Sequence, residues 1–384
     1  MSSCPSCGGT TPGGEFCVRC GAPLGQEFTG RSRGRSHYAA APHEHVALPM
    51  VISSLFPHLP RSSHLGFRLA LLAGGAVIVG LAAGRLFPLA LIAAATLLPL
   101  LVVLYLVEVN VYEDEPLWAM SLTLVWGVLT GVGFGLLALA ATPSFGSLIV
   151  NGSSQYLVIQ GLVLPFCGLL VLLGGPLVLL RYHRFNSVLD GVTFGACTAA
   201  AFGGAQAITY GVNVLGSGLR PDGAVLPWIW RLLSLGLAMP VLTMGAAAAV
   251  CAALWLRYRA PARDAEALGP LGHPAVALPA AAALVMGGAV GETFLPAGAW
   301  LGWLAAFDLG VIMLLRRAVH VGLLEESLEI PLGPDFTCPN CGRLTARHTF
   351  CGHCGISLQA LPKLPGSPGP APGHPPAPSP EAAT

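Results

Sequence analysis

The amino-acid sequence predicts an all-α polytopic membrane bundle of about eight transmembrane helices, flanked by two small four-cysteine zinc ribbons. Three observations lead to this prediction. Only 10% of the 384 residues are charged and 54% are hydrophobic, whereas a soluble domain carries about 25% charged residues. Eight apolar segments approach or exceed the length that crosses a bilayer. Four cysteines recur with the same spacing near each end of the chain.

Residues 1–25 are predicted to form the first ribbon. Its cysteines follow a C-x2-C-x9-C-x2-C pattern and are Cys4, Cys7, Cys17 and Cys20. Each C-x2-C pair can form a tight knuckle, and two knuckles bring four thiolates to one ion, as in structural zinc sites. Four thiolates leave no open position for water, which argues against a catalytic zinc site.

Residues 336–358 are predicted to form the second ribbon. The cysteines are Cys338, Cys341, Cys351 and Cys354, at identical spacing, and nine of eighteen aligned positions match the first ribbon. Both modules resemble the zinc-ribbon group, which implies small metal-stapled modules that often mediate interactions. The alternative is that these cysteines form disulfides. His348 and His353 lie nearby and are interpreted as solvated side chains that are not needed as ligands. We expect the two ribbons to meet.

Three further segments are predicted to lack a core of their own. They are a flexible linker at 26–65, a linker at 318–335 and a disordered proline-rich tail at 359–384. A basic cluster in the first linker is interpreted as solvated, with contact to anionic lipid heads as the alternative. The histidines of that linker fit no metal site. The basic cluster consists of Arg31, Arg33 and Arg35, and the histidines are His37, His43 and His45.

The helical bundle is predicted to occupy residues 66–317. Its apolar segments are Leu69–Ala83, Phe87–Val107, Leu117–Ala141, Tyr156–Leu180, Val188–Val214, Leu232–Leu256, Pro274–Val290 and Phe294–Leu315. At about 1.5 Å per residue, most of them can cross a hydrocarbon core of about 30 Å. The first and the seventh are short. The start of the chain lacks a basic stretch followed by an apolar core, so we expect no cleaved signal peptide.

Loop charges predict the orientation. Eight spans place both termini on one side, and if that side is the cytoplasm, nine arginines fall in inner loops and three in outer loops, as the positive-inside rule expects. The inner ones are Arg61, Arg68, Arg181, Arg184, Arg257, Arg259, Arg263, Arg316 and Arg317, and the outer ones are Arg85, Arg220 and Arg231. The sequence therefore predicts a multi-pass protein of the cytoplasmic membrane with both termini in the cytoplasm. Thiols stay reduced there, which favours zinc over disulfides.

Glycines spaced every fourth residue predict close contacts between helices. They are Gly80 and Gly84, then Gly127, Gly131 and Gly135, and finally Gly191 and Gly195. Three single cysteines within the spans, Cys167, Cys197 and Cys251, are interpreted as small buried hydrophobes.

Ionisable groups inside a bilayer are candidates for function by default. Asp190 begins the fifth span, Asp308 lies within the eighth and Glu108 ends the second, whereas no histidine lies inside a predicted span. Asp190 is interpreted as a helix cap, with a catalytic acid as the alternative. Asp308 is interpreted as making a structural hydrogen bond, with a role in binding a ligand or ion as the alternative.

Two motifs resemble those of the PrsW-like glutamic intramembrane proteases. The acidic stretch at 112–116 is similar to that family's YEPEP segment, and residues 190–195 are similar to its DGxxxG segment. The matching residues are Tyr112, Glu113, Glu115, Pro116, Asp190, Gly191 and Gly195. The similarity covers roughly residues 101–250, with the family's order and spacing of spans. It implies a helical bundle whose chemistry needs paired glutamates, a Glu-Asn pair and a histidine.

The chain departs from that family at each catalytic position. Activating water requires a base together with an acid or a metal ligand, yet apolar or neutral residues stand at these places. They are Phe166, Cys167, Gly168 and Leu169 for the paired glutamates, Ala205 and Gln206 for Glu-Asn, and Val241 and Leu242 for the histidine, whereas Tyr210, Pro240 and Gly245 are kept. Each acid–base group is typically worth about 10² to 10⁴-fold in rate, so we expect no useful proteolysis.

The sequence therefore favours a non-catalytic pseudoprotease that binds a membrane partner and acts as a scaffold or signalling component through its ribbons. The alternative is an active peptidase that uses Asp190, Asp308 or Glu108. A transporter is less favoured, because two intramembrane acids are too few to line a substrate or ion pathway and no spans are clearly paired as inverted repeats. The expected partners are the lipid bilayer, a membrane or cytoplasmic protein, and a second copy of the chain. The net charge of +1 argues against nucleic acid.

Overall fold

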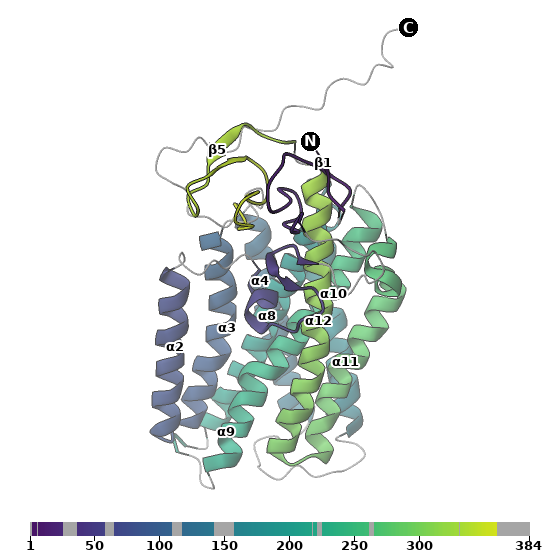
Figure 1. Cartoon of the computed structure of the whole chain (residues 1–384). Coiled ribbons are helices and arrows are strands. Elements are labelled where there is room, and N and C mark those ends of the chain that lie inside the picture. The colour runs from purple at the N-terminus through teal and green to yellow at the C-terminus, as the bar shows by residue number, and fades with distance from the viewer. Residues whose placement is uncertain are drawn as a thin grey trace.

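Eight helices that are long and apolar enough to cross a membrane run side by side, and both cysteine modules lie at one end of them (Figure 1). A computed structural model of the whole chain describes residues 2–5, 7–25, 37–57, 65–109, 117–141, 157–216, 218–220, 225–260, 265–329 and 331–358. The predicted fold class is confirmed. The basic cluster at 31–35, the acidic stretch at 112–116 and the tail at 359–384 lie outside the described residues.

The spans have the following bounds in chain order. They are α2 (Leu65–Ala83), α3 (Phe87–Val109), α4 (Leu117–Ala141), the composite of η1 (Leu157–Val163), α6 (Leu164–Leu172) and α7 (Gly174–Leu179), α8 (Val188–Leu215), the composite of α9 (Val225–Leu233), η2 (Ser234–Ala238) and α10 (Met239–Tyr258), α11 (Pro274–Phe294) and α12 (Ala297–Glu329). A short helix, η3 (Ala265–Gly272), precedes α11. The first and seventh spans, which looked short in the sequence, are each long enough to cross a membrane.

Proline accompanies the change of helix type within the fourth and the sixth spans. Each contains wide π-helical turns, η1 or η2, that end two residues before Pro165 or Pro240. Proline has no N–H, and its ring clashes with the carbonyl four residues earlier, so a helix interrupted by proline kinks or changes its turn. The wide turns accommodate that loss without ending the span.

α8 is the central helix of the bundle. In its apolar stretch 83% of the residues are buried, against 6% in α2. Helices in lipid gain little hydrophobic energy from meeting each other, so close packing of small residues has to hold them together. A Cβ atom added at Gly127 of α4 would overlap the carbonyl oxygen of Thr198 in α8, and one added at Gly131 would overlap that of Phe202. The predicted glycine contacts of α4 are therefore confirmed.

α8 also packs closely on α10. A Cβ atom added at Gly191 would lie 2.8 Å from the carbonyl oxygen of Cys251, and one added at Gly195 would lie 2.8 Å from that of Ala247. The glycines of the DGxxxG segment thus form a helix interface. Cys251 and Cys197 are buried as predicted, whereas Cys167 is only partly buried.

The glycine pair of the first span makes no such contact, so that prediction is wrong. No atom lies within 4 Å of a Cβ atom added at Gly80, and Gly84 meets only the turn to which it belongs. α2 is the most exposed of the spans, and α3 is the span against which it packs. Its contact with α3 uses Gly74, where an added Cβ atom would overlap the Leu97 side chain.

The eighth helix is longer than predicted. α12 continues to Glu329, so residues 318–329 of the predicted 318–335 linker are helical. Its 33 residues span about 50 Å, which exceeds a hydrocarbon core of about 30 Å. Arg316 and His320 lie inside this helix and are buried, which corrects the expectations that Arg316 belongs to a loop and that no span contains a histidine.

Part of the predicted 26–65 linker is also folded. β3 (His37–Tyr38) and β4 (Ala41–His45) pair as an antiparallel hairpin, and the short helix α1 (Val51–Leu55) follows. Tyr38, Ala39 and Val46 are buried against the bundle, and α1 packs on α12. We call residues 37–57 the N-terminal plug. Its fold was not visible in the sequence, because the segment has no sustained helix or strand periodicity and its partners lie in the last span.

We predict that α4 tolerates a large side chain only on its free face. The variant Gly131→Leu should destabilise the bundle by roughly 1–3 kcal/mol or more, because the added side chain meets the backbone of α8. The matched variant Gly133→Leu should change stability little, since nothing lies within 4 Å of an added Cβ atom there. Denaturant unfolding in detergent measures both, and equal effects would contradict the assigned interface.

Candidate metal centres and the segment beneath them

The four cysteine sulfurs of each ribbon converge on one point. In each ribbon they all lie within 4.8 Å of one another. The shortest separations are Cys4–Cys20 3.7 Å, Cys7–Cys17 3.9 Å, Cys338–Cys354 3.9 Å and Cys341–Cys351 3.8 Å. A tetrahedral site with metal–sulfur bonds of about 2.3 Å separates its sulfurs by about 3.8 Å, whereas a disulfide requires about 2.05 Å. The geometry fits a four-thiolate metal site in each ribbon and excludes disulfides.

Short hairpins and glycine turns position these sulfurs. β1 (Ser2–Ser3) pairs with β2 (Thr10–Thr11), and β5 (Asp335–Thr337) pairs with β6 (Leu344–Ala346). Each C-x2-C pair is followed by a glycine whose φ lies between +68° and +71°. Its amide donates a hydrogen bond to the carbonyl of the first cysteine of that pair. The left-handed backbone makes glycine the favoured residue at each knuckle, and the four are Gly8, Gly21, Gly342 and Gly355.

The electrostatics of the sites also call for a cation. Burial raises the pKa of the Cys338 thiol to about 12. Four sulfurs at these separations repel one another once they are ionised. A bound metal ion offsets both effects, because it holds coordinating thiols in the thiolate form.

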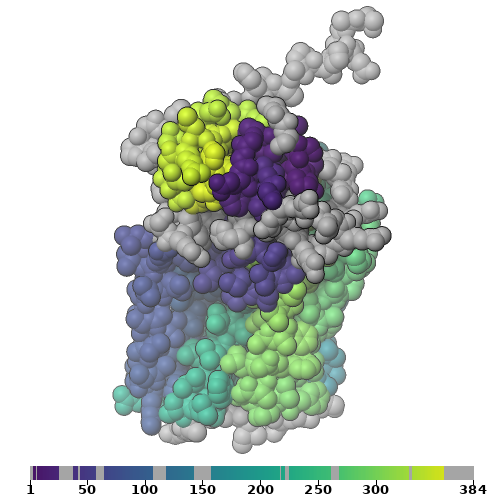
Figure 2. Space-filling model, in the orientation of Figure 1, coloured from purple at the N-terminus to yellow at the C-terminus, as the bar shows by residue number. Residues whose placement is uncertain are grey.

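The two ribbons pack against each other through an approximate two-fold exchange of hydrogen bonds. The amide of Phe16 donates to the carbonyl of Gly352, and the amide of Phe350 donates to the carbonyl of Val18, each at 2.9 Å. Phe16 aligns with Phe350 and Val18 with Gly352 in the sequence repeat. The expectation that the ribbons meet is confirmed, and Figure 2 displays them side by side on top of the bundle.

The histidines near the second site have different environments. His348 is buried, and its Nδ1 accepts a hydrogen bond from the amide of Thr349 at 2.8 Å, so the prediction of a solvated side chain is wrong for it. His353 is half-buried, with its Nε2 3.0 Å from the carbonyl oxygen of Leu344. Neither histidine joins a cysteine group.

The first ribbon sits on the end of α12. The guanidinium of Arg19 donates to the carbonyl of Ser327 at 3.1 Å, in the last turn of that helix. Carbonyls at a helix C-terminus have no partner within the helix, and a cationic side chain both caps them and suits the helix dipole. Leu324, one turn earlier, packs against the cysteines of the first ribbon. The four-cysteine group of the first ribbon therefore packs directly on the last span.

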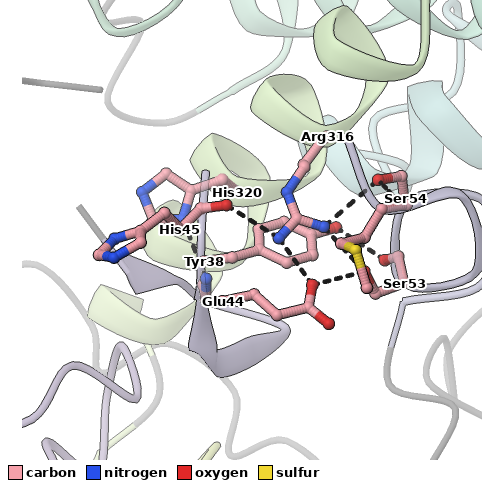
Figure 3. Close-up of polar contacts among 9 residues, drawn as sticks. Tyr38, Glu44, His45, Ser53, Ser54, Arg316 and His320 are labelled. Carbon is pink, nitrogen blue, oxygen red and sulfur yellow. Dashed lines mark hydrogen bonds and ion pairs between the residues drawn. The ribbon is translucent and has the colours of Figure 1, made fainter. Parts of the chain in front are cut away.

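Below this contact, a buried arginine of α12 holds the N-terminal plug (Figure 3). Arg316 is 0% exposed. Its Nη2 donates to the Glu44 carboxylate at 2.8 Å and to the His45 carbonyl at 3.0 Å, and its Nη1 donates to the Ser53 hydroxyl at 2.8 Å. The guanidinium also stacks on the ring of Tyr38, 3.8 Å from its centroid. We call these contacts the Arg316 clamp.

The clamp is a charged site that sequence reasoning missed. A buried charge is costly unless it is paired and hydrogen-bonded, and the planar guanidinium meets that need with several donors in a fixed fork. One turn along α12, His320 Nδ1 accepts a hydrogen bond from the amide of Ala39 at 3.1 Å. The signal in the sequence was an arginine and a histidine spaced four apart on a continuing helix.

The acidic residues singled out in the sequence have different environments in the structure. Asp190 accepts a hydrogen bond from the Ser187 amide at 3.0 Å, and Ser187 Oγ accepts one from the Leu189 amide at 3.1 Å. This capping box confirms Asp190 as a helix cap. Asp308 differs from its prediction, since its buried Oδ1 has no hydrogen-bond partner among the described residues. The side chain of Glu108 lies outside the described residues.

A second ion pair within the bundle lies at the end opposite the ribbons, near α9 (Figure 1). Arg231 and Glu292 are 3.6 Å apart with side chains 11% and 16% exposed, and Arg231 stands 5.8 Å from the centre of the Tyr210 ring. Arg231 was expected in an outer loop. The sixth and seventh helices are longer than predicted, so they carry both residues into the bundle.

No third centre gathers several ligand-type side chains in the part of the chain that the structure describes. Groups of three or more His, Cys, Asp or Glu with ligand atoms close together occur there only at the two ribbons. Comparison of the chain with known protein families, with curated proteins and with solved structures finds no match.

We predict that the Arg316 clamp holds the plug in place. Breaking a buried ion pair typically lowers the free energy of unfolding by about 3–5 kcal/mol. Because a fifth of the Glu44 side chain is exposed, the loss caused by Arg316→Met should lie at the lower end of this range. Hydrogen–deuterium exchange of residues 37–57 should then increase strongly. Arg317→Met, at a half-buried neighbour, is the control and should leave that exchange unchanged, and equal protection in both variants would contradict the clamp.

Proposed function

We propose that this chain is a zinc-ribbon membrane protein without a catalytic centre, which binds a membrane or cytoplasmic protein and acts as a scaffold or signalling component. One observation carries the proposal. The paired ribbons join directly to the last span through Arg19 and Leu324, so a partner bound at either part would act on the other. A second copy of the chain is a further candidate partner, through the ribbons or the exposed spans.

Zinc is the ion that we propose for both sites. Soft thiolates in a tetrahedral set favour zinc among the common divalent ions. Four thiolates also complete its coordination sphere, so the ion would hold the ribbon together and activate no water. The arginine-rich loops of the predicted topology favour a cytoplasmic position for the ribbons, where reduced thiols would remain available to the metal.

Elemental analysis of the purified chain is expected to find two zinc ions per molecule. Cys4→Ser and Cys338→Ser should each reduce the content to one ion, and the double variant should hold none. Cys167→Ser, which changes a cysteine outside the ribbons, is the control and should keep both ions. A double variant that retains its zinc would defeat the assignment.

The relation to the PrsW-like proteases remains part of this proposal, as a pseudoprotease. The roles of the matching residues support the non-catalytic part of this proposal, since Gly191 and Gly195 serve the contact with α10 and Asp190 caps α8. Tight packing and capping account for these residues without chemistry. The second candidate function is an active peptidase, and the observation that favours it is the buried Oδ1 of Asp308, which has no hydrogen-bond partner among the residues that the structure describes.

Reconstitution with a helical membrane substrate distinguishes the two functions. We expect no cleavage by the native chain and no difference on changing Asp190→Asn or Asp308→Asn, because no base, acid and metal ligand converge among the described residues. Mass spectrometry of the substrate is the measurement. Cleavage that Asp308→Asn abolishes would establish the peptidase instead, provided that this variant keeps two zinc ions and the native melting temperature.

A further inference from the structure

The N-terminal plug exposes an unbroken apolar stretch. All six residues of Ala47–Ile52 are exposed and apolar, and the four largest side chains, Leu48, Met50, Val51 and Ile52, are 44%, 50%, 53% and 67% exposed. We call Ala47–Ile52 the apolar wedge. Contiguous apolar surface of this kind marks a contact with a membrane or with another protein.

Polar side chains on both sides of the wedge are bound on the side that faces α12, although His45 is itself exposed. Glu44 and Ser53 bind Arg316, and the Ser54 hydroxyl donates to the carbonyl of Met50 at 2.5 Å. No charged residue occurs from Val46 to Pro57. The plug thus has a polar inner face held by α12 and an apolar outer face, which is the division found in segments that lie in a membrane interface.

Two measures place the plug at the boundary of the hydrocarbon core. Arg316 is 19 residues from Ala297, where α12 begins, and 19 residues rise about 29 Å, close to the core thickness of about 30 Å. At the other side of the plug, the ring of Phe56 packs edge-on against Phe67, 4.9 Å between centroids. Phe67 lies in the first turn of α2, so the plug is level with the ribbon-side end of that span.

We propose that the apolar wedge inserts into the leaflet on the ribbon side and contacts lipid acyl chains. The neighbouring span α2 exposes Leu65 and Leu69 at its start, so the wedge continues a surface that already faces lipid. The Arg316 clamp fixes the wedge to α12 from within. This inference does not depend on the proposed scaffold function or on the identity of the metal.

Photo-crosslinking in lipid nanodiscs tests the wedge. The residue p-benzoylphenylalanine replaces Ile52, Leu72 or Leu344 in the full-length protein, one position at a time. The three native side chains are 67%, 69% and 67% exposed, so exposure is matched. Leu72 lies within α2 and serves as the lipid-facing control, and Leu344 lies in β6 of the second ribbon and serves as the control outside the membrane. A native melting temperature verifies that each variant is folded.

After illumination, mass spectrometry should find lipid adducts at position 52 in a yield close to that at position 72 and several-fold above that at position 344. A yield at position 52 no higher than at position 344 would overturn the proposal. So would adducts at position 52 that contain only protein, since they would assign the wedge to a protein partner. Lipids with a nitroxide in the acyl chain give a second readout, through paramagnetic broadening of a label at position 52.

Discussion

The close packing of α8 against α4 and α10 forms the centre of the bundle, around which the other helices are arranged. Lipid surrounds the bundle, so exclusion of water does little to hold one helix to another. Glycines let the backbones meet, and the carbonyls of Thr198, Phe202, Ala247 and Cys251 occupy the space where side chains would otherwise stand. The same glycines that resemble a protease motif therefore have a complete explanation in packing.

α12 binds both the N-terminal plug and the first ribbon. Arg316 binds the plug, Leu324 supports the first ribbon, and the carbonyl of Ser327 accepts the Arg19 side chain. These contacts follow one another within the last four turns of a single helix. A shift of that helix along its axis would therefore move the plug and the ribbons together, which no arrangement of separate flexible linkers could do.

Sequence reasoning succeeded where the determinants are local. The spacing of the cysteines predicts each four-sulfur cluster because a knuckle involves only neighbouring residues. Asp190 was recognisable as a cap because its partner Ser187 is three residues away. Reasoning failed where distant segments satisfy each other. Glu44 and Arg316 are 272 residues apart, and one fell in the predicted linker and the other in a predicted loop. The sixth span was predicted to begin too late, which left Arg231 outside it, and the eighth was predicted to end too early, before Arg316.

The reciprocal hydrogen bonds between the ribbons impose an order in time. Phe16 and Val18 are translated before any span, whereas their partners Gly352 and Phe350 follow all eight. At about 5–20 residues per second, the first module waits tens of seconds for the second. Its pairing edge is thus open during biogenesis and closes once the final helix has been inserted, so that a chain truncated before the second module would keep this edge permanently available to other proteins.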